Sequence, residues 1–322
     1  MILPLCISLC TTTKVEGQDI HFSQIDINPV LFNPSYSGFF EGNGRVGVNY
    51  RNQWASVSEP YQTFSLSAEV SLYRNKRHRF GVNVGTFAYS DHAGTLNYGT
   101  TAGDLILSAY HGIGGRGNTL LSAAASIGCG QSGFNPSNAI TTELETFETN
   151  EAFFTNVSAG IAIFHQFNDQ VFAKIGFSGQ HLNRPQLSYL SNEDAFLEPK
   201  YNGYCRFNFD LSEFVCLMPV AAMQIQKNYH EAIYGIDAKY YYSQDFVKQI
   251  NFLAGILVRH NDAIIFNLGM DYNTLTLALS YDANISKLAS ASHTIGAFEI
   301  GVTYRFISSP EARKKAISCP TF

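Results

Sequence analysis

The sequence feature that most constrains the fold is a strict two-residue alternation of apolar and polar side chains. Between Thr63 and Leu72 every second residue is apolar, and Thr, Ser or Glu fills the positions between. Successive side chains of a β-strand point to opposite faces, so this pattern predicts a strand with one apolar and one polar face. The alternation recurs around Val46, Val82, Val171, Phe207, Ile264 and Phe298.

Strand number and composition decide between two folds that both show this alternation. A soluble β-sandwich would need polar outer faces on both sheets. Only 15% of the residues are charged and 14% are aromatic, against about 25% charged in soluble domains. No apolar run reaches the roughly 18–20 residues of a membrane-spanning helix. We therefore predict an all-β fold, an antiparallel transmembrane β-barrel of about 14 strands, rather than a soluble enzyme.

The expected strands are even in number, as in bacterial single-chain barrels. They begin near Gly44, Tyr61, Arg79, Thr95, Asn118, Ala152, Val171, Tyr201, Phe214, Glu231, Phe246, Ala263, Thr274 and Thr294. The three longest gaps between them are 135–151, 182–200 and 283–293, and all follow odd-numbered strands. Because the long loops of outer-membrane barrels are extracellular, the first strand is predicted to run outward. Pro219 makes the ninth strand the least regular one, since strand prolines belong at edges or bulges.

Four segments are expected along the chain. Residues 1–17 are predicted to form a secretory signal peptide, although no Lys or Arg precedes the apolar run, so a truncated start is expected. Residues 18–43 form an N-terminal segment, too irregular for a strand, that either plugs the lumen or lies in the periplasm. Residues 44–307 form the barrel, and residues 308–322 a periplasmic C-terminal tail. A lipid-modified Cys10 is the weaker alternative at the N-terminus.

The final strand carries a second, more specific pattern. Outer-membrane barrels commonly end with a polar residue, a glycine two positions on, and two spaced aromatic or apolar residues. Glu299, Gly301, Tyr304 and Phe306 match this pattern. We interpret them as an assembly signal of an outer-membrane protein from a Gram-negative bacterium.

Catalytic and metal-binding motifs are weak in this sequence. His21 and Ser23 have a His-x-Ser spacing that some outer-membrane phospholipases use, but a packed segment is the favoured interpretation. No cysteine pair has CxxC spacing, so neither a zinc site nor any other cofactor is expected. Cys205 and Cys216 could approach each other across a hairpin, but their parity does not place them directly opposite. We therefore predict that the protein is not an enzyme.

Charged residues occur at many inward-facing positions of the predicted strands. An internal ion-pair network is favoured over a selective polar channel, because both signs are mixed and no single-sign ring appears. The residues concerned are Arg45, Arg51, Glu69, Asp104, Lys174, Arg206, Asp210, Asp237, Lys239, Arg259, Asp271, Glu299 and Arg305.

Two sequence blocks resemble the PorP/SprF family of the type IX secretion system. The first runs from Gln18 to Gln24 and continues through Asn28-Pro29, Asn33-Pro34, Gly38 and the segment Tyr50 to Trp54. The second comprises residues 280–286 and 296–300, and the tail 317–320 extends it. The resemblance implies an outer-membrane protein that supports export or surface anchoring of large surface proteins, such as adhesins used in gliding motility. It also implies that periplasmic ring-forming lipoproteins and the secreted cargo are partners.

Several residues are candidates for docking those partners. The N-terminal candidates are Asn28, Pro29, Asn33 and Pro34, and the basic candidates are Arg74, Lys76, Arg77, Arg79, Arg313, Lys314 and Lys315. A solvated run of charges is the ordinary explanation for the basic residues. Nucleic acid is not an expected partner, since the formal net charge is −5. The alternative functions are a general diffusion channel or solute transporter and, third, a barrel-embedded lipid hydrolase.

Overall fold

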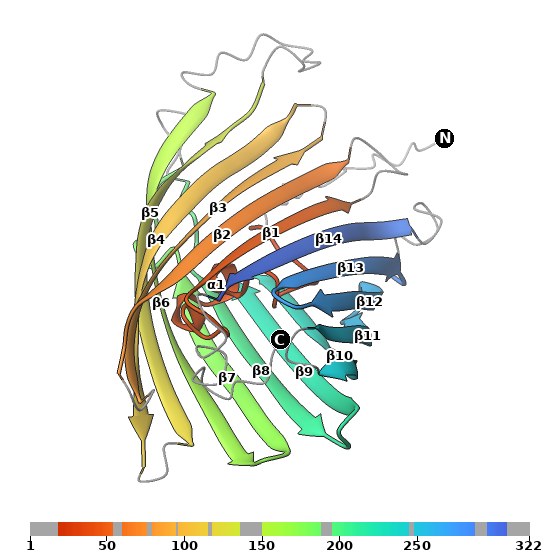
Figure 1. The fold of residues 1–322 in the computed structure, drawn as a ribbon. Coiled ribbons are helices and arrows are strands. Elements are labelled where there is room, and N and C mark those ends of the chain that lie inside the picture. The colour runs from red at the N-terminus through yellow and green to blue at the C-terminus, as the bar shows by residue number, and fades with distance from the viewer. Residues whose placement is uncertain are drawn as a thin grey trace, which may run out of the picture.

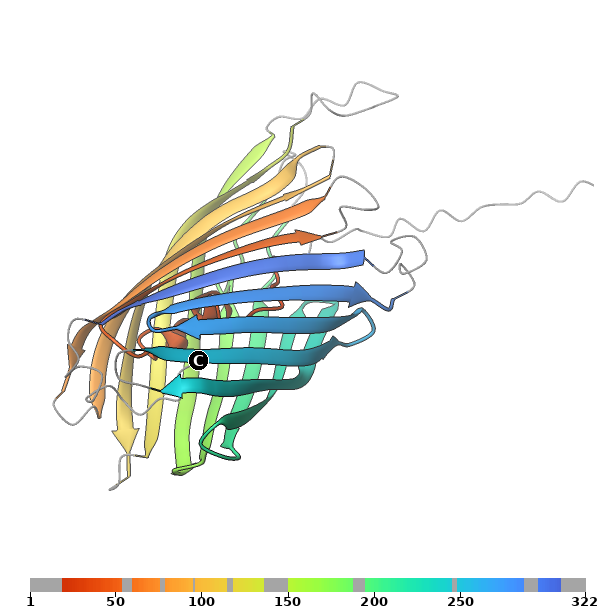
Figure 2. The same cartoon turned by 45° about the vertical axis from the view of Figure 1, so that its right-hand side comes forward.

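The protein folds into one closed antiparallel β-barrel of fourteen strands, in which each strand pairs with its neighbours in sequence and β1 pairs with β14. The computed structural model describes residues 19–53, 60–75, 79–94, 96–114, 118–135, 150–187, 195–244, 248–286 and 295–307. Figures 1 and 2 show the strands as a continuous tilted wall. The predicted fold class and strand number are confirmed.

Every strand begins within about three residues of its expected start. The bounds are β1 Gly44–Gln53, β2 Tyr61–Arg74, β3 Phe80–Ala93, β4 Tyr98–Ile113, β5 Thr119–Gly133, β6 Glu151–Asn168, β7 Val171–Gln180, β8 Lys200–Asp210, β9 Val215–Gln226, β10 Tyr229–Gln244, β11 Gln249–Arg259, β12 Ala263–Tyr272, β13 Leu275–Asn284 and β14 Ile295–Phe306.

Alternation in the sequence becomes alternation across the barrel wall. On β2, Phe64 and Leu66 are exposed on the outer surface, whereas Ser65 and Ser67 between them are buried on the lumen side. The outer surface is therefore apolar, as a surface in contact with lipid must be. The lumen side is polar, yet its side chains are buried, so most of the lumen is filled.

Strand β9 shows how the barrel tolerates its proline. Pro219 pairs with Ile236 of β10, but the ladder toward β8 skips from the pair Arg206–Val220 to the pair Phe209–Leu217. Proline has no N–H to donate, so one edge of the ladder is interrupted without loss of register. Cys216 lies on the lumen side of this strand and Cys205 on the outer side of β8, and both are free thiols.

The N-terminal segment Asp19–Asn43 fills the lumen, and we call it the plug. It contains two short helical turns, α1 (Pro29–Phe32) and η1 (Pro34–Tyr36), each opened by a proline whose missing N–H is not needed there. In Figure 1, α1 lies inside the ring of strands. Among the described residues, no helix is long and apolar enough to cross a membrane.

The plug crosses the lumen along its length. Asp19 contacts His181 and Lys200, at the barrel end where β7 ends and β8 begins. Asn43 lies at the opposite end, where its backbone N–H donates to the carbonyl of Phe306 at the end of β14 (2.8 Å). The segment therefore runs antiparallel to β1, which it precedes. Residues 1–18 and 308–322, which include the predicted signal peptide and tail, lie outside the described residues.

Candidate functional site

A buried cluster of charges ties the plug to three strands. Arg51 of β1 and Arg259 of β11 both pair with Asp282 of β13, at 3.0 and 2.8 Å. The Ser23 hydroxyl of the plug accepts hydrogen bonds from Arg51 (3.0 Å) and Arg259 (2.6 Å). It lies 3.0 Å from both Asp282 carboxylate oxygens, and it can donate to one of them. Two guanidinium groups thus converge on one plug hydroxyl, and the adjoining carboxylates balance their charge.

A second cluster lies around Asp26 of the plug. Its carboxylate accepts from Lys174 of β7 (3.1 Å) and from Arg206 of β8 (2.7 Å), while the Tyr204 hydroxyl donates to it (2.9 Å). Arg206 also pairs with Asp237 of β10. Burial alone would raise the pKa of Asp26, but the cations Arg206 and Lys174 hold this pKa below its usual range.

A third ionic contact fixes the start of the plug. The carboxylate of Asp19 lies 3.1 Å from the ring of His181 and 3.4 Å from the ammonium of Lys200. Burial opposes the charged form, yet the nearby Lys200 keeps the pKa of Asp19 below its usual range. Ion pairs with the wall therefore hold the plug at its start and in its middle.

Several uncharged side chains of the wall, and one lysine, donate hydrogen bonds to the main chain of the plug. Their side-chain donors point at plug carbonyls, which would otherwise be buried without partners. The bonds run from Ser178 to Phe32 (2.6 Å), Asn202 to Phe32 (3.0 Å), Ser122 to Ser35 (2.8 Å), Ser108 to Ser37 (3.0 Å), Asn83 to Ser37 (3.2 Å) and Lys200 to Ile20 (2.7 Å).

Inward-facing glycines make room for the plug. A Cβ atom at Gly301 would come within 2.7 Å of both the Gln24 and Ile27 side chains. At Gly176 it would overlap the hydroxyl of Tyr36. Other positions of this kind are Gly47 against Asn28 and Gly160 against Asn33. The wall and the plug are thus complementary in shape as well as in charge.

Aromatic rings complete the packing. Phe39 of the plug stacks on Phe164 of β6, with ring centroids 3.6 Å apart. Tyr36 meets Phe164 and Tyr204 edge to face, and the ammonium of Lys174 lies 4.1 Å from the centre of the Tyr36 ring. Such contacts each add to the stability that burial alone provides.

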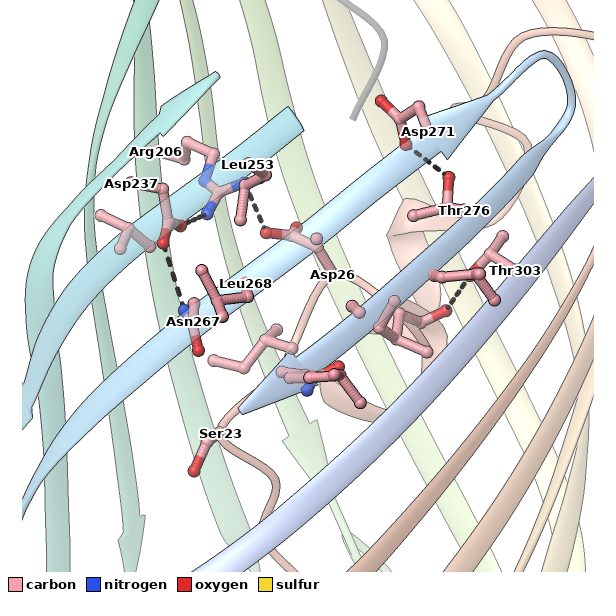
Figure 3. A pocket seen from close by; sticks show the side chains of 18 of the residues that line it. Ser23, Asp26, Arg206, Asp237, Leu253, Asn267, Leu268, Asp271, Thr276 and Thr303 are labelled. Carbon is pink, nitrogen blue, oxygen red and sulfur yellow. Dashed lines mark hydrogen bonds and ion pairs between the residues drawn. The ribbon is translucent and has the colours of Figure 1, made fainter. Parts of the chain in front are cut away.

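Part of the lumen stays unfilled beside the plug. A cavity of about 110 Å³ separates the plug residues Ser23–Ile27 from the inner wall of β10–β13. Figure 3 shows Leu253, Asn267 and Thr276 around it, with Asp26 and Ser23 on the plug side.

The structure assigns the predicted N-terminal docking residues to the lumen. Asn28 lies between the hydroxyls of Ser65 (2.7 Å) and Ser67 (2.8 Å). Pro29 opens α1, Pro34 opens η1, and the Asn33 side chain accepts from the N–H of Ser35 (2.9 Å). All four are buried, so they do not face a partner while the plug is seated.

The predicted basic residues are only partly described. Arg74 ends β2 and is half-buried, and Arg79 donates to the carbonyls of Gly112 and Gly114. Lys76, Arg77, Arg313, Lys314 and Lys315 lie outside the described residues.

The four residues of the expected assembly signal divide between two faces. Glu299 and Gly301 face the lumen, where both contact the plug. Tyr304 and Phe306 are exposed on the outer face, with their rings edge to face at 4.9 Å. The two lumen-facing positions therefore contact the plug, and the assembly role remains a prediction.

Most of the inward charges form the expected ion-pair network, whereas Asp104 accepts hydrogen bonds from Ser126 (2.7 Å) and Asn156 (2.9 Å). Besides the clusters above, Arg45 pairs with Glu69 (2.7 Å) and Lys239 with Asp271 (2.9 Å). Sequence reasoning missed the plug carboxylates Asp19 and Asp26, because only the closed barrel brings them beside their cations. The Ser23 hydroxyl is hydrogen-bonded to Asp282 and the two arginines. These contacts agree with the packed segment that is the favoured interpretation of His21 and Ser23.

Comparisons with known structures agree with the barrel. A FadL homologue from Pseudomonas aeruginosa is 11% identical and matches 85% of this chain and 93% of its own, with a TM-score of 0.51. The toluene transporter TodX from P. putida is 10% identical and matches 88% and 95%, with a TM-score of 0.50. At such identities the likeness shows the fold alone.

Sequence comparisons are more specific about the family. No curated protein matches the chain. The family model of the type IX secretion system membrane protein PorP/SprF matches residues 14–304. With the outer-membrane barrels above, this match locates the protein in the outer membrane. Because the match spans most of the chain, the protein belongs to the PorP/SprF family of type IX secretion system membrane proteins.

Proposed function

We propose that this barrel supports the export or surface anchoring of large surface proteins, including adhesins used in gliding, as part of a type IX secretion system. The observation that carries the proposal is the family match over residues 14–304. The partners would be periplasmic ring-forming lipoproteins on one side and the secreted cargo on the other. No catalytic step is required of the barrel in this role.

The filled lumen favours this role over free diffusion of solutes. The ion pairs of Asp19 and Asp26 join the plug to β7 and β8, and the charge-assisted hydrogen bond from Arg259 to Ser23 joins it to β11. A permanently open pore would need a water-filled path through this region. We therefore infer that any opening of the lumen requires movement of the plug. In planar bilayers the wild-type protein should pass little current, and a large steady conductance would favour the diffusion channel.

Ring contact is proposed for the basic residues near one barrel end. Arg74 and Arg79 flank the connection between β2 and β3, at the end where β1 begins and β14 ends. Reversing the charges of Arg74, Lys76, Arg77 and Arg79, together with Arg313–Lys315, should weaken co-purification with the ring lipoproteins. The matched control is charge reversal of Arg184, an exposed residue in the connection between β7 and β8 at the opposite end of the barrel. Unchanged recovery of the ring would contradict the proposed contact.

The deciding experiment is genetic. Deleting the gene should leave surface proteins trapped inside the cell, and the wild-type copy should restore their display. Purifying the barrel from solubilised outer membranes should recover ring lipoproteins with it. Normal display of surface proteins in the deletion strain would overturn the proposal.

A further inference from the structure

The lumen wall is not chemically uniform. Inward positions on β1 and β2 are polar, as at Asn49, Ser65 and Ser67. On β9–β12, inward polar residues are interspersed with a cluster of aliphatic ones, which we call the aliphatic patch; its residues are Val220, Ala222, Ile233, Leu257 and Ile265, and all of these are buried. Interiors of membrane barrels are ordinarily polar. The aliphatic patch therefore marks a part of the lumen that is suited to apolar groups.

The plug covers the aliphatic patch without filling the space in front of it. Ile25 and Ile27 of the plug form one side of the cavity of about 110 Å³. On the opposite side, Gly269 of β12 and Ala278 of β13 present almost no side chain, and Leu253 of β11 is only half-buried. An inward leucine with exposed surface inside an otherwise packed lumen indicates space that no protein atom occupies.

The charges around the cavity are compensated. Arg206 pairs with Asp26 at 2.7 Å and also with Asp237, and Arg305 lies 3.8 Å from Glu41. The Asp271 carboxylate is matched by Lys239 and by a hydrogen bond from Thr276 (2.7 Å). These groups are already engaged, so an ionic ligand would gain little here and would bear the cost of desolvation.

We propose that this cavity is a binding site for a small, uncharged, apolar group, either a single aromatic ring or the end of an alkyl chain. An apolar protein cavity of roughly 150 Å³ stays dry and binds benzene, so this cavity lies in the size range of one ring or a short alkyl segment. The group enters as a free molecule or as the terminus of a lipid acyl chain. In both cases it packs between Ile25 on the plug and Leu253 on the wall, and it stabilises the seated plug.

Fluorobenzene is a suitable probe, followed by ¹⁹F NMR on the full-length, delipidated protein. The wild type should show a saturable bound signal. Ala278→Leu, which fills the cavity, should weaken the binding of the probe at least tenfold. Ala254→Leu is the matched control: the same change on β11, at an exposed position on the lipid-facing side, should leave binding unchanged. Heat-modifiable migration in gels checks that each variant folds.

Two further outcomes are informative. If added phospholipid displaces the probe from the wild type, the natural occupant is an acyl chain, and if it does not, the occupant is a free small molecule. Leu253→Phe, a second filling variant, guards against misfolding of Ala278→Leu. Absence of a saturable signal in the wild type would overturn the proposal. Equal binding by the wild type and a folded filling variant would overturn it as well.

Discussion

Arg51 and Glu299 face each other across the line where the barrel closes. They are directly paired in the β1–β14 register, and the Arg51 guanidinium donates to the Glu299 carboxylate inside the lumen. The same carboxylate accepts the backbone N–H groups of Ser23 (2.7 Å) and Gln24 (3.0 Å). One buried side chain therefore serves both the closure of the barrel and the seating of the plug.

Replacing Arg51 with alanine should destabilise the protein strongly. It would leave the buried carboxylate of Glu299 without its cation. Removing one partner of a buried pair typically costs about 3–5 kcal/mol. We expect a lower unfolding midpoint in denaturant and faster hydrogen exchange at Ser23 and Gln24.

The control is Arg184→Ala, which removes an exposed ion pair with Glu198. Exposed pairs contribute about 0–1 kcal/mol, so this variant should behave like the wild type. If Arg51→Ala and Arg184→Ala shifted the unfolding midpoint equally, the pairing of β1 with β14 would not depend on the buried Arg51–Glu299 pair.

Substituting Gly176 should unseat the plug, whereas substituting a nearby glycine should not. A valine at Gly176 would overlap the hydroxyl of Tyr36, which is packed against the wall. Overpacking of this kind costs about 1–3 kcal/mol. A Cβ atom added at Gly203 on the neighbouring strand would meet no atom within 4 Å, so Gly203→Val is the control. Limited proteolysis within residues 19–43 measures the effect, and equal cleavage of both variants would contradict it.

Acid should loosen the plug through Asp26. Its pKa is below the usual value when the plug is seated between Lys174 and Arg206, and is close to about 3.9 when the plug is free. A carboxyl group with a lowered pKa in the bound state stabilises that state above its free pKa, and this contribution is lost as the pH falls below about 4.

We therefore expect the contribution of Asp26 to proteolytic protection of the plug to be constant from about pH 8 to 5 and to decline below about pH 4. Asp26→Asn should remove part of that decline, because the amide does not titrate while Tyr204 can still donate to it. The difference between the wild type and the variant isolates Asp26 from the other carboxyl groups. An identical pH profile for both proteins would show that Asp26 does not control seating.

Local pattern was enough to predict the wall but not the plug. The alternation within each strand shows which residues face the lumen and which face outward. β2 and its neighbours could therefore be placed before any contact was known. Even the interruption at Pro219 follows from a property of that residue alone. Strand number then follows from counting, and closure follows because an open edge in lipid is too costly.

The contacts of the plug depend on closure and carry no local signal. Ser23 and Asp282 are 259 residues apart in sequence, and nothing near Ser23 indicates a carboxylate partner. Likewise, the spacing of Asn28-Pro29 and Asn33-Pro34 indicates turns, but not the wall that receives them. The irregularity of residues 18–43 left two positions open, and only the lumen-facing donors and glycines show which one the segment occupies.

Removing the plug should open the barrel. The wall keeps its own ion pairs without the plug, since Arg51 and Arg259 each still contact Asp282, and Arg45 still contacts Glu69. The wall should therefore fold after deletion of residues 19–43, although Lys174 loses Asp26.

In planar bilayers this deletion variant should conduct far more current than the wild type. Arg51→Ala should flicker between the two levels, because its plug is only loosened. Arg184→Ala should resemble the wild type. A folded deletion variant with wild-type conductance would mean that some part of the chain other than the plug closes the lumen.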